Sequence, residues 1–271
     1  MNEKKRTFSS ISCLGIVLLG GALVVGGIVV VMLFVWRSTV SVSYERRLST
    51  VPTHIIIENP VGDVRVRPGK DKTYVLEVHK RVRGSWIGRR EEMQQVLDEM
   101  SVDVEELGDV VRIKVHRPPI ANTFRSVSVD LFITVPQQVD IDVTQDVGQV
   151  AIAGVEGAFQ VQNNVGLVDL QNVTLTGMTT VEVDSGDLRF KGHLPQQGTV
   201  KLGTGSGSIN VDLPSESAFI LDASVGVGHI KVALPSRTEE SKRNLHLVVG
   251  SAPAVKLVVH AETGSITIDA K

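Results

Sequence analysis

The chain has 271 residues, of which 42% are apolar but only 4% are aromatic, and its formal net charge is −2. Because this balance presents no strongly basic face, we do not expect nucleic acid as a partner. The single cysteine, Cys13, lies near the N-terminus, which excludes disulfides and cysteine-based metal sites from the rest of the chain. With so few aromatic residues, the core must be filled by Val, Ile and Leu, which suit β-strands.

An apolar run without charged residues extends from Ile11 to Trp36. About 20 apolar residues cross a ~30 Å hydrocarbon core, so the sequence predicts a transmembrane helix over residues 11–36 after a cytoplasmic tail, residues 1–10. The alternative is a cleaved signal peptide, whose apolar region usually has about 7–15 residues, with Ser41-Val42-Ser43 as the cleavage site. Basic residues balance on the two sides of the run, and long domains cross membranes largely regardless of charge. We therefore expect one membrane span with the C-terminal domain on the extracytoplasmic side.

A linker over residues 37–50 is expected to lead into an N-terminal β module over residues 51–135. Alternating aliphatic residues predict its strands at residues 54–57, 61–66, 74–82, 102–104, 110–115 and 132–135. The one helical signal lies at residues 89–100, where Met93, Val96, Leu97 and Met100 share a helix face. We expect this helix to cover an end or edge of the β structure, where unpaired strand groups would invite aggregation.

A short repeat dominates the remaining residues, 136–271, and begins earlier in the chain. It consists of Val, Ser or Thr, then glycine, and then aliphatic or Phe residues at alternate positions. The repeat glycines are Gly62, Gly148, Gly166, Gly186, Gly207, Gly228 and Gly264. From Gly148 onward the intervals are 18, 20, 21, 21 and 36 residues. The longest interval contains a charged stretch, residues 235–244, which we expect to be a surface loop.

An alternating strand also precedes each of the repeat glycines from Gly148 onward, so one repeat is a strand, a glycine corner and a second strand. Such a unit buries its apolar face only when neighbours stack on it about 4.8 Å apart. The sequence therefore predicts an all-β fold, a β-solenoid or β-roll, with the seven glycines as corners. The competing fold is an antiparallel sandwich of hairpins, but the chain has no Asn-Gly or Asp-Gly dipeptide of the kind that hairpin turns favour.

The order of these features resembles a known family. A G-x-V-x-V start at Gly62, a short helix ending in Leu97-Asp98-Glu99-Met100, a Val135-Pro136 step and G-x-[IVL]-x-[IVL] repeats are similar to the DUF4097 "putative adhesin" domain, a relative of toastrack domains. The resemblance covers about residues 51–271. It implies a right-handed, solenoid-like all-β domain, often attached to membrane helices, without a catalytic motif. It also implies a role in sensing, scaffolding or signalling at the bacterial cell envelope.

The sequence offers no cluster of catalytic or metal-binding residues. The seven histidines are scattered, and His229 and His260 alternate with aliphatic residues, which places them on an outer strand face. The glycine-rich stretch of residues 203–207 looks like a phosphate loop, but a strand rather than a helix follows it. We therefore predict no catalytic residue, cofactor or metal.

Charged residues in the repeats leave two further interpretations open. One set near the corners consists either of turn-forming or solvated residues or of a Ca²⁺-binding strip without the calcium-roll signature: Asp184, Asp187 and Asp222. A second set can align on one sheet, either as an ordinary mixed charged face or as in polysaccharide-active β-helix enzymes: Asp169, Arg189 and Lys231.

These observations predict a non-enzymatic, membrane-anchored domain that acts in binding, scaffolding or signalling at the bacterial cytoplasmic membrane. Its expected partners are membrane lipid, through residues 11–36, and proteins at the membrane, contacted through residues 124–135 or 235–244. One alternative is a structural accessory subunit of a larger membrane complex. The other is a polysaccharide-active β-helix enzyme.

Overall fold

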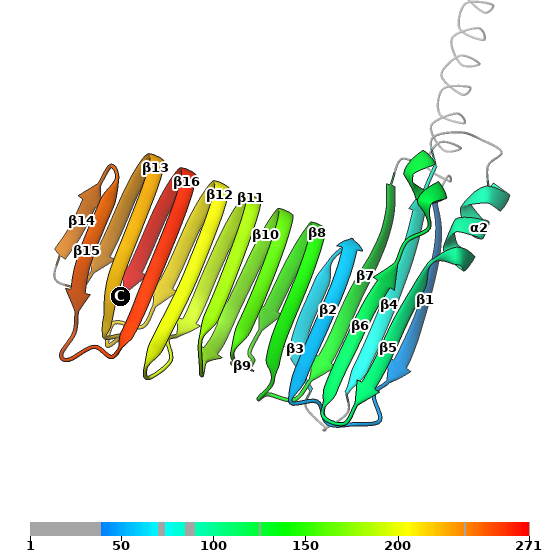
Figure 1. The fold of residues 1–271 in the computed structure, drawn as a ribbon, viewed down its shortest axis with the longest axis horizontal. Helices are drawn as coiled ribbons and strands as arrows, with labels where there is room; N and C mark the ends of the chain where they lie inside the picture. Colours follow the sequence, from blue (N-terminus) through cyan, green and yellow to red (C-terminus); the bar gives the residue numbers. More distant parts are fainter. Residues whose placement is uncertain (1–38, 70–73, 85–89, 125, 236, 271) are drawn as a thin grey trace, which may run out of the picture.

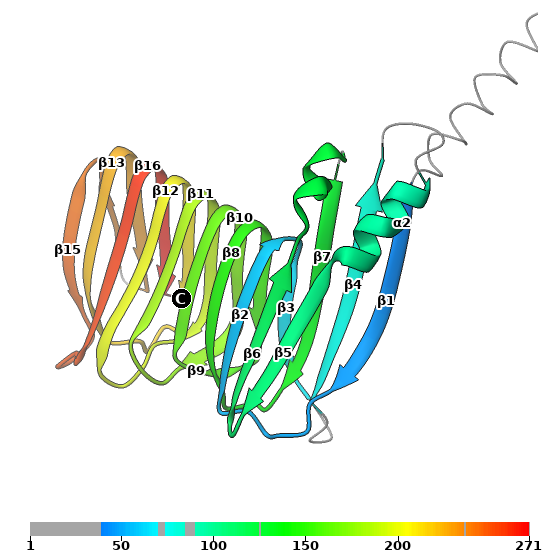
Figure 2. The same ribbon diagram turned by 45° about the vertical axis from the view of Figure 1, so that its right-hand side comes forward.

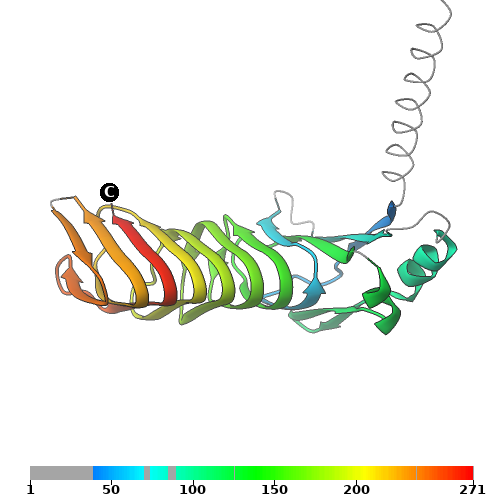
Figure 3. The same ribbon diagram turned by 90° about the horizontal axis from the view of Figure 1, so that it is seen from above.

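The computed structural model describes residues 39–69, 74–84, 90–124, 126–235 and 237–270 (Figure 1). Its strands belong to one 16-stranded sheet, which folds back on itself so that two layers face each other (Figure 3). The predicted membrane span, residues 11–36, lies outside the described residues. Within them, no helix is long and apolar enough to cross a membrane.

Six long strands carry the repeat, and each one bends at its glycine. They are β8 (Asp140–Ala153), β10 (Phe159–Leu175), β11 (Thr179–His193), β12 (Gly198–Leu213), β13 (Phe219–Leu234) and β16 (Val255–Ala270). Each strand is one rung: its first leg, before the glycine, lies in one layer, and its second leg lies in the other (Figure 2). We call the line of bends the corner edge. The opposite edge, where loops and the short strand β9 (Glu156–Gly157) connect the rungs, is the loop edge.

The stack of rungs begins before residue 136, the expected start of the solenoid. β2 (His54–Val61) and β3 (Val64–Pro68) form a rung around Gly62, and both strands pair in parallel with β8. Beside this rung, β6 (Val110–His116) pairs with β2, and β7 (Ser126–Val135) pairs with β3. The 3-10 helix η1 (Pro119–Thr123) joins β6 to β7 where the other rungs have a glycine. The N-terminal module thus continues both layers of the repeat.

Antiparallel strands and a helix complete the N-terminal end. β5 (Ser101–Leu107) pairs with β6, β4 (Val75–Arg83) pairs with β7, and β1 (Thr39–Arg47) pairs with β4 along its whole length. β1 therefore occupies most of the segment that was expected to be a linker. α2 (Arg90–Glu99), within the predicted range 89–100, packs on β1 and β4 and buries Met93, Val96 and Leu97.

One carboxylate fastens the end of β1 to β5. Oε2 of Glu106 accepts hydrogen bonds from the backbone N–H groups of Ser49 and Thr50 at 2.9 and 3.1 Å and from their hydroxyls at 2.7 and 3.1 Å. The Ser49 hydroxyl is the largest cause that lowers the pKa of Glu106. This side chain therefore links the two layers at the N-terminal end.

The C-terminal rungs depart from chain order. β16 inserts between β12 and β13 and pairs in parallel with both of them. β14 (Arg237–Ser241) and β15 (Asn244–Val249) then pair antiparallel with the second and first legs of β13 and end the stack. The prediction of a surface loop over residues 235–244 is therefore wrong, because these residues include a strand that covers the edge of β13.

Aliphatic side chains from successive rungs stack in register between the layers. One fully buried row consists of Val64, Val150, Val168, Leu188, Ile209, Ile266 and Ile230. Phe159, Phe190 and Phe219 are the largest buried side chains. The prediction of an all-β, solenoid-like fold is confirmed, and the hairpin sandwich is excluded because neighbouring long rungs run parallel.

Candidate binding surface

A ladder of glycines forms the corner edge, in the stacking order Gly62, Gly148, Gly166, Gly186, Gly207, Gly264 and Gly228. Their φ angles lie between 135° and 148°, a region that residues with a Cβ rarely adopt. Each glycine also faces a backbone oxygen of the neighbouring strand, so that a Cβ on Gly186 would overlap the carbonyl oxygen of Gly166. Both the backbone angle and the close approach of the corners therefore require glycine.

Buried polar side chains, three residues before four of these glycines, bind backbone oxygens inside the corner. The donors and acceptors are Asn59 Nδ2 to Val129 O at 3.0 Å, Gln145 Nε2 to Gly62 O at 2.5 Å, Asn163 Nδ2 to Gly148 O at 3.0 Å and Thr204 Oγ1 to Gly186 O at 3.0 Å. We call this set the inner polar row. It was missed in the sequence, although the polar residue at a fixed distance before the glycine was a visible signal.

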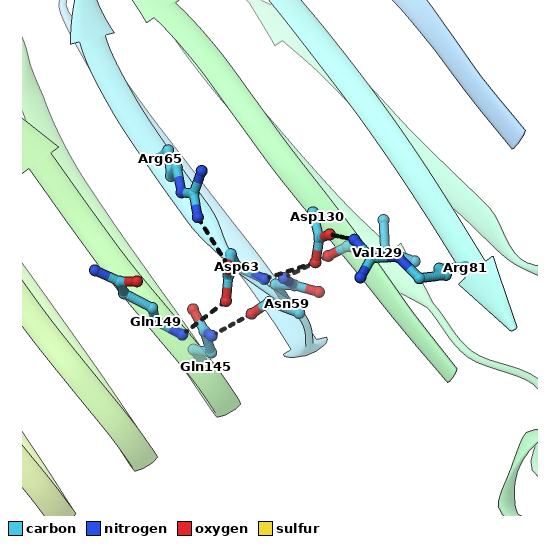
Figure 4. Close-up of polar contacts among 9 residues, drawn as sticks. Asn59, Asp63, Arg65, Arg81, Val129, Asp130, Gln145 and Gln149 are labelled. Atoms are coloured by element: carbon cyan, nitrogen blue, oxygen red, sulfur yellow. Dashed lines mark hydrogen bonds and ion pairs between the residues drawn. The ribbon is translucent and has the colours of Figure 1, made fainter. Parts of the chain in front are cut away.

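Carboxylates fasten the first corner to β7 (Figure 4). Asp130, on β7, accepts a hydrogen bond from the Asp63 N–H at 3.1 Å and lies 2.5 Å from Nη2 of Arg81. Asp63 in turn accepts from the Gln149 N–H at 3.2 Å and pairs with Arg65 at 3.2 Å. These carboxylates satisfy backbone donors beside the bend and tie four neighbouring strands together, β4, β7, β3 and β8.

The outward residue before each glycine contributes to a ridge along the corner edge. This corner ridge consists of Val61, Val147, Val165, Ser185, Ser206, Thr263 and Val227 in stacking order. Val147, Val165 and Val227 are 44%, 48% and 68% exposed. The ridge therefore presents aliphatic side chains toward both of its ends and hydroxyl groups between them.

Charges are distributed unevenly along the corner edge. Along this edge, exposed acidic residues recur on the first legs: Asp146 on β8, Asp184 on β11 and Glu262 on β16, which are the second, fourth and sixth of the seven rungs. The ends of the edge carry cations, Arg83 and Arg117 at the N-terminal end and Lys242 and Arg243 in the turn between β14 and β15. None of these four cations forms an ion pair with another residue that the structure describes.

Two adjoining hollows lie at the loop edge. Their volumes are about 510 and 750 Å³, and they share Thr174 and His193. Their lining includes polar side chains that form no hydrogen bond or ion pair with any other described residue: Asn172, Lys191, His193, Asp212, Gln196 and Gln197. These hollows therefore hold donors and acceptors that the fold itself leaves unused.

A third hollow, of about 320 Å³, lies on the first-leg face above Gly203 and Gly205. Its lining includes Glu182 of β11 and His260 of β16, which is exposed as predicted and lies 2.9 Å from the Ser224 hydroxyl. Among the described residues, no group of three or more His, Cys, Asp or Glu is arranged to hold a metal ion. The glycine-rich stretch that resembled a phosphate loop lies within β12.

The corner aspartates do not form one strip. Asp184 and Asp187 lie on opposite legs of the same rung, and Asp187 accepts a hydrogen bond from the Ser208 N–H at 2.9 Å. Asp222 lies on β13, 2.6 Å from Nζ of Lys256 and 2.5 Å from Nδ1 of His246. The hydrogen bond from Lys256, followed by that from His246, lowers the pKa of Asp222. The interpretation of a Ca²⁺-binding strip is therefore wrong.

The second predicted charged set does share a row. Asp169 and Arg189 are register partners on the second legs, and Lys231 lies farther along the same row beyond Asn210 and Thr267.

Residues 124–135, an expected contact segment, mostly form β7 inside the second layer. The inward side chains of β7 are buried, so this segment offers little surface to a partner.

Comparison with known proteins identified one family and several similar solved structures. A family model described as Toastrack DUF4097 matches residues 125–269. A solved structure of a "putative cell adhesion protein" from Clostridium sporogenes is 14% identical, with 86% of this chain and 100% of that chain covered and a TM-score of 0.47. A "putative adhesin" from Bacteroides fragilis is 15% identical, with 84% and 96% covered and a TM-score of 0.47.

A third solved structure, a "putative lipid binding protein" from Parabacteroides distasonis, is 11% identical, with 84% of this chain and 94% of that chain covered and a TM-score of 0.29. A comparison with curated proteins gave no match.

Proposed function

The chain belongs to the Toastrack DUF4097 family, and from this premise we propose that it is a non-enzymatic, membrane-tethered domain that binds and scaffolds partner proteins at the bacterial cell envelope. Residues 11–36 serve as the tether in this proposal, and the β domain lies outside the cytoplasmic membrane. The uncharged length of that segment and the capacity of long domains to be exported support this arrangement.

The observation that carries the proposal is the stack of rungs with unused polar groups along its loop edge. Parallel rungs repeat about every 4.8 Å and share one continuous core, so side chains on different rungs keep fixed spacings. The two loop-edge hollows fall within the usual volume range of ligand pockets, about 300–1,000 Å³, but they are open and present several polar side chains beside apolar surface. Such a surface suits an extended segment of a protein partner better than an enclosed small molecule.

Site-specific crosslinking in native membranes tests the binding role. A photocrosslinking amino acid at Gln196, in the loop-edge hollows, is expected to give a discrete adduct with a partner protein. The same residue at Asn210, on the second-leg face, is the matched control and should give none. Equal adducts at both positions, or none at Gln196 in chain that stays in carbonate-washed membranes, would count against this function.

The alternative function, a structural accessory subunit, differs from the proposed binding role in how the chain should migrate in native gels. A structural subunit migrates with one large assembly in blue-native gels under all conditions, whereas a binding domain exchanges between free and bound forms. The enzyme alternative rests on the charged row that contains Asp169. Degradation of envelope polysaccharide by the purified chain, lost in Asp169→Asn, would replace the proposed function with catalysis.

A further inference from the structure

The described chain begins at the corner edge. Thr39 is the register partner of Arg83, which in turn pairs with Ser126 at the start of β7. The upper ends of β1, β4 and β7 in Figure 1 lie on the same side as the bends of the long rungs. The loop edge lies on the opposite side, at the far end of each leg.

Only two residues separate the uncharged run from the first strand. Trp36 ends the run, and β1 begins at Thr39. Three extended residues span at most about 11 Å, so a bilayer that holds residues 11–36 must lie within about that distance of the corner edge at β1. A leg of about seven residues extends roughly 23 Å, so the loop edge is much farther from Thr39.

From this geometry, which rests on the tether of the proposed function, we infer that the corner edge lies on the lipid headgroup surface. The corner ridge supplies exposed valines that contact the interface, with Val147 and Val165 nearer the tether and Val227 at the far end. The stack then runs along the bilayer, and the loop edge faces away from it.

The charges of the edge match lipid phosphates at its two ends. Lys242 and Arg243 lie beside Val227, because the backbone N–H of Val225 donates to the Arg243 carbonyl oxygen at 2.7 Å. Arg83 and Arg117 occupy the end nearer the tether. The acidic residues Asp146, Asp184 and Glu262, together with Asp63 and Asp187 on the second legs, are spread along the edge between these cations and repel phosphates there. Attraction to lipid phosphates is therefore supplied at the two ends of the edge, by these four cations.

Headgroup quenching in vesicles tests this orientation. Cys13→Ser removes the only native cysteine, and single cysteines at Val147, Val227 and Gln196 then carry a fluorophore in the full chain. In vesicles of phosphatidylethanolamine and phosphatidylglycerol that contain a headgroup nitroxide lipid, labels at positions 147 and 227 should be quenched several-fold more than the label at 196. Equal or stronger quenching at 196 would overturn the orientation.

Two further measurements keep the inference separate from its premise. Loss of the chain from carbonate-washed vesicles would refute the tether, and with it the proposed membrane role. A retained chain with the wrong quenching order would refute only the orientation.

The variant Lys242→Glu/Arg243→Glu should lower quenching at position 227 but not at 147, and Lys231→Glu, on the second-leg face, should change neither. Unchanged quenching at 227 in the double variant would overturn the lipid contact of this turn.

Discussion

The corners and the two ends of the stack are built by different means. Every corner uses the same residue at the same position, because each glycine must accept the same backbone angle and the same close neighbour. The two ends share no structural feature. At the N-terminal end, η1 joins β6 to β7 and Glu106 links the two layers, whereas at the C-terminal end the antiparallel strands β14 and β15 cover the edge of β13. A repeat can therefore be specified by one recurring residue, whereas an end depends on particular side chains.

The largest effect is expected from a methyl group at a central corner. Gly186→Ala adds a Cβ at φ 146° that overlaps the Gly166 carbonyl oxygen, so the rung must shift. Left-handed strain and overpacking together should lower the free energy of unfolding by at least about 3 kcal/mol in urea titrations. Gly203→Ala is the control, since its nearest neighbour would be a side-chain carbon of Glu182 at 3.7 Å. Equal losses of unfolding free energy in the two variants would show that glycine is no more required at the corners than elsewhere in a rung.

The inner polar row can be extended by one isosteric change. Val183 lies between Asn163 and Thr204 in this row, and Val183→Thr would let a hydroxyl donate to the Gly166 carbonyl oxygen as Thr204 does to Gly186. Its stability should stay within about 0.5 kcal/mol of the parent, because the new hydrogen bond offsets the buried hydroxyl.

Val181→Thr provides the comparison for that change. Val181 is fully buried on the same strand but lies away from the corner carbonyls, so its hydroxyl should cost about 1–2 kcal/mol in the same urea titration. If both threonines destabilise the chain equally, the row does not depend on carbonyl acceptors.

The N-terminal end should respond to loss of one charge. Glu106→Gln weakens four hydrogen bonds to residues 49 and 50. Charge-assisted bonds of this kind contribute more than neutral ones, so we expect a loss of about 1–2 kcal/mol. Hydrogen exchange should rise in β1 and β5 but not in β11. Faster exchange throughout the stack would mean that the hydrogen bonds of Glu106 stabilise the whole domain and not only its N-terminal end.

The smallest effect is a pH dependence at the C-terminal end. Because the folded pKa of Asp222 is lowered, its charged form stabilises the fold above the unfolded pKa of about 3.9, and this contribution disappears as the pH falls through the folded pKa. The urea midpoint of Asp222→Asn should therefore lie slightly below that of the parent at about pH 6 and meet it at about pH 2. A gap that persists in acid would point to packing rather than charge.

The repeat could be found from the sequence because one residue type carries it. Glycine at a fixed place between alternating aliphatic residues predicted bent, stacked strands, and the row from Val64 to Ile230 is stacked in that way. The inner polar row was missed, although its signal was in the sequence: Asn59, Gln145, Asn163 and Thr204 each precede a repeat glycine by three residues.

The order of the last rungs could not be read in the same way. β13 and β16 present equivalent glycines and equivalent aliphatic rows, so either strand fits against β12 in register. The choice depends on which rung is covered by β14 and β15, a long-range property of the whole end. The hollows of the loop edge escaped prediction for a similar reason, because strand ends and loops from several rungs must first meet to line them.

The placement of β16 also has a bearing on biosynthesis. Residues 255–270 are synthesised after β12 and β13, so those two strands lack the neighbour that joins them until the last part of the chain is made. Each earlier long rung pairs with the long rung before it in the chain, whereas β12 and β13 are joined only through residues 255–270. During that interval the exposed edges of β12 and β13 are available to chaperones or to another nascent chain.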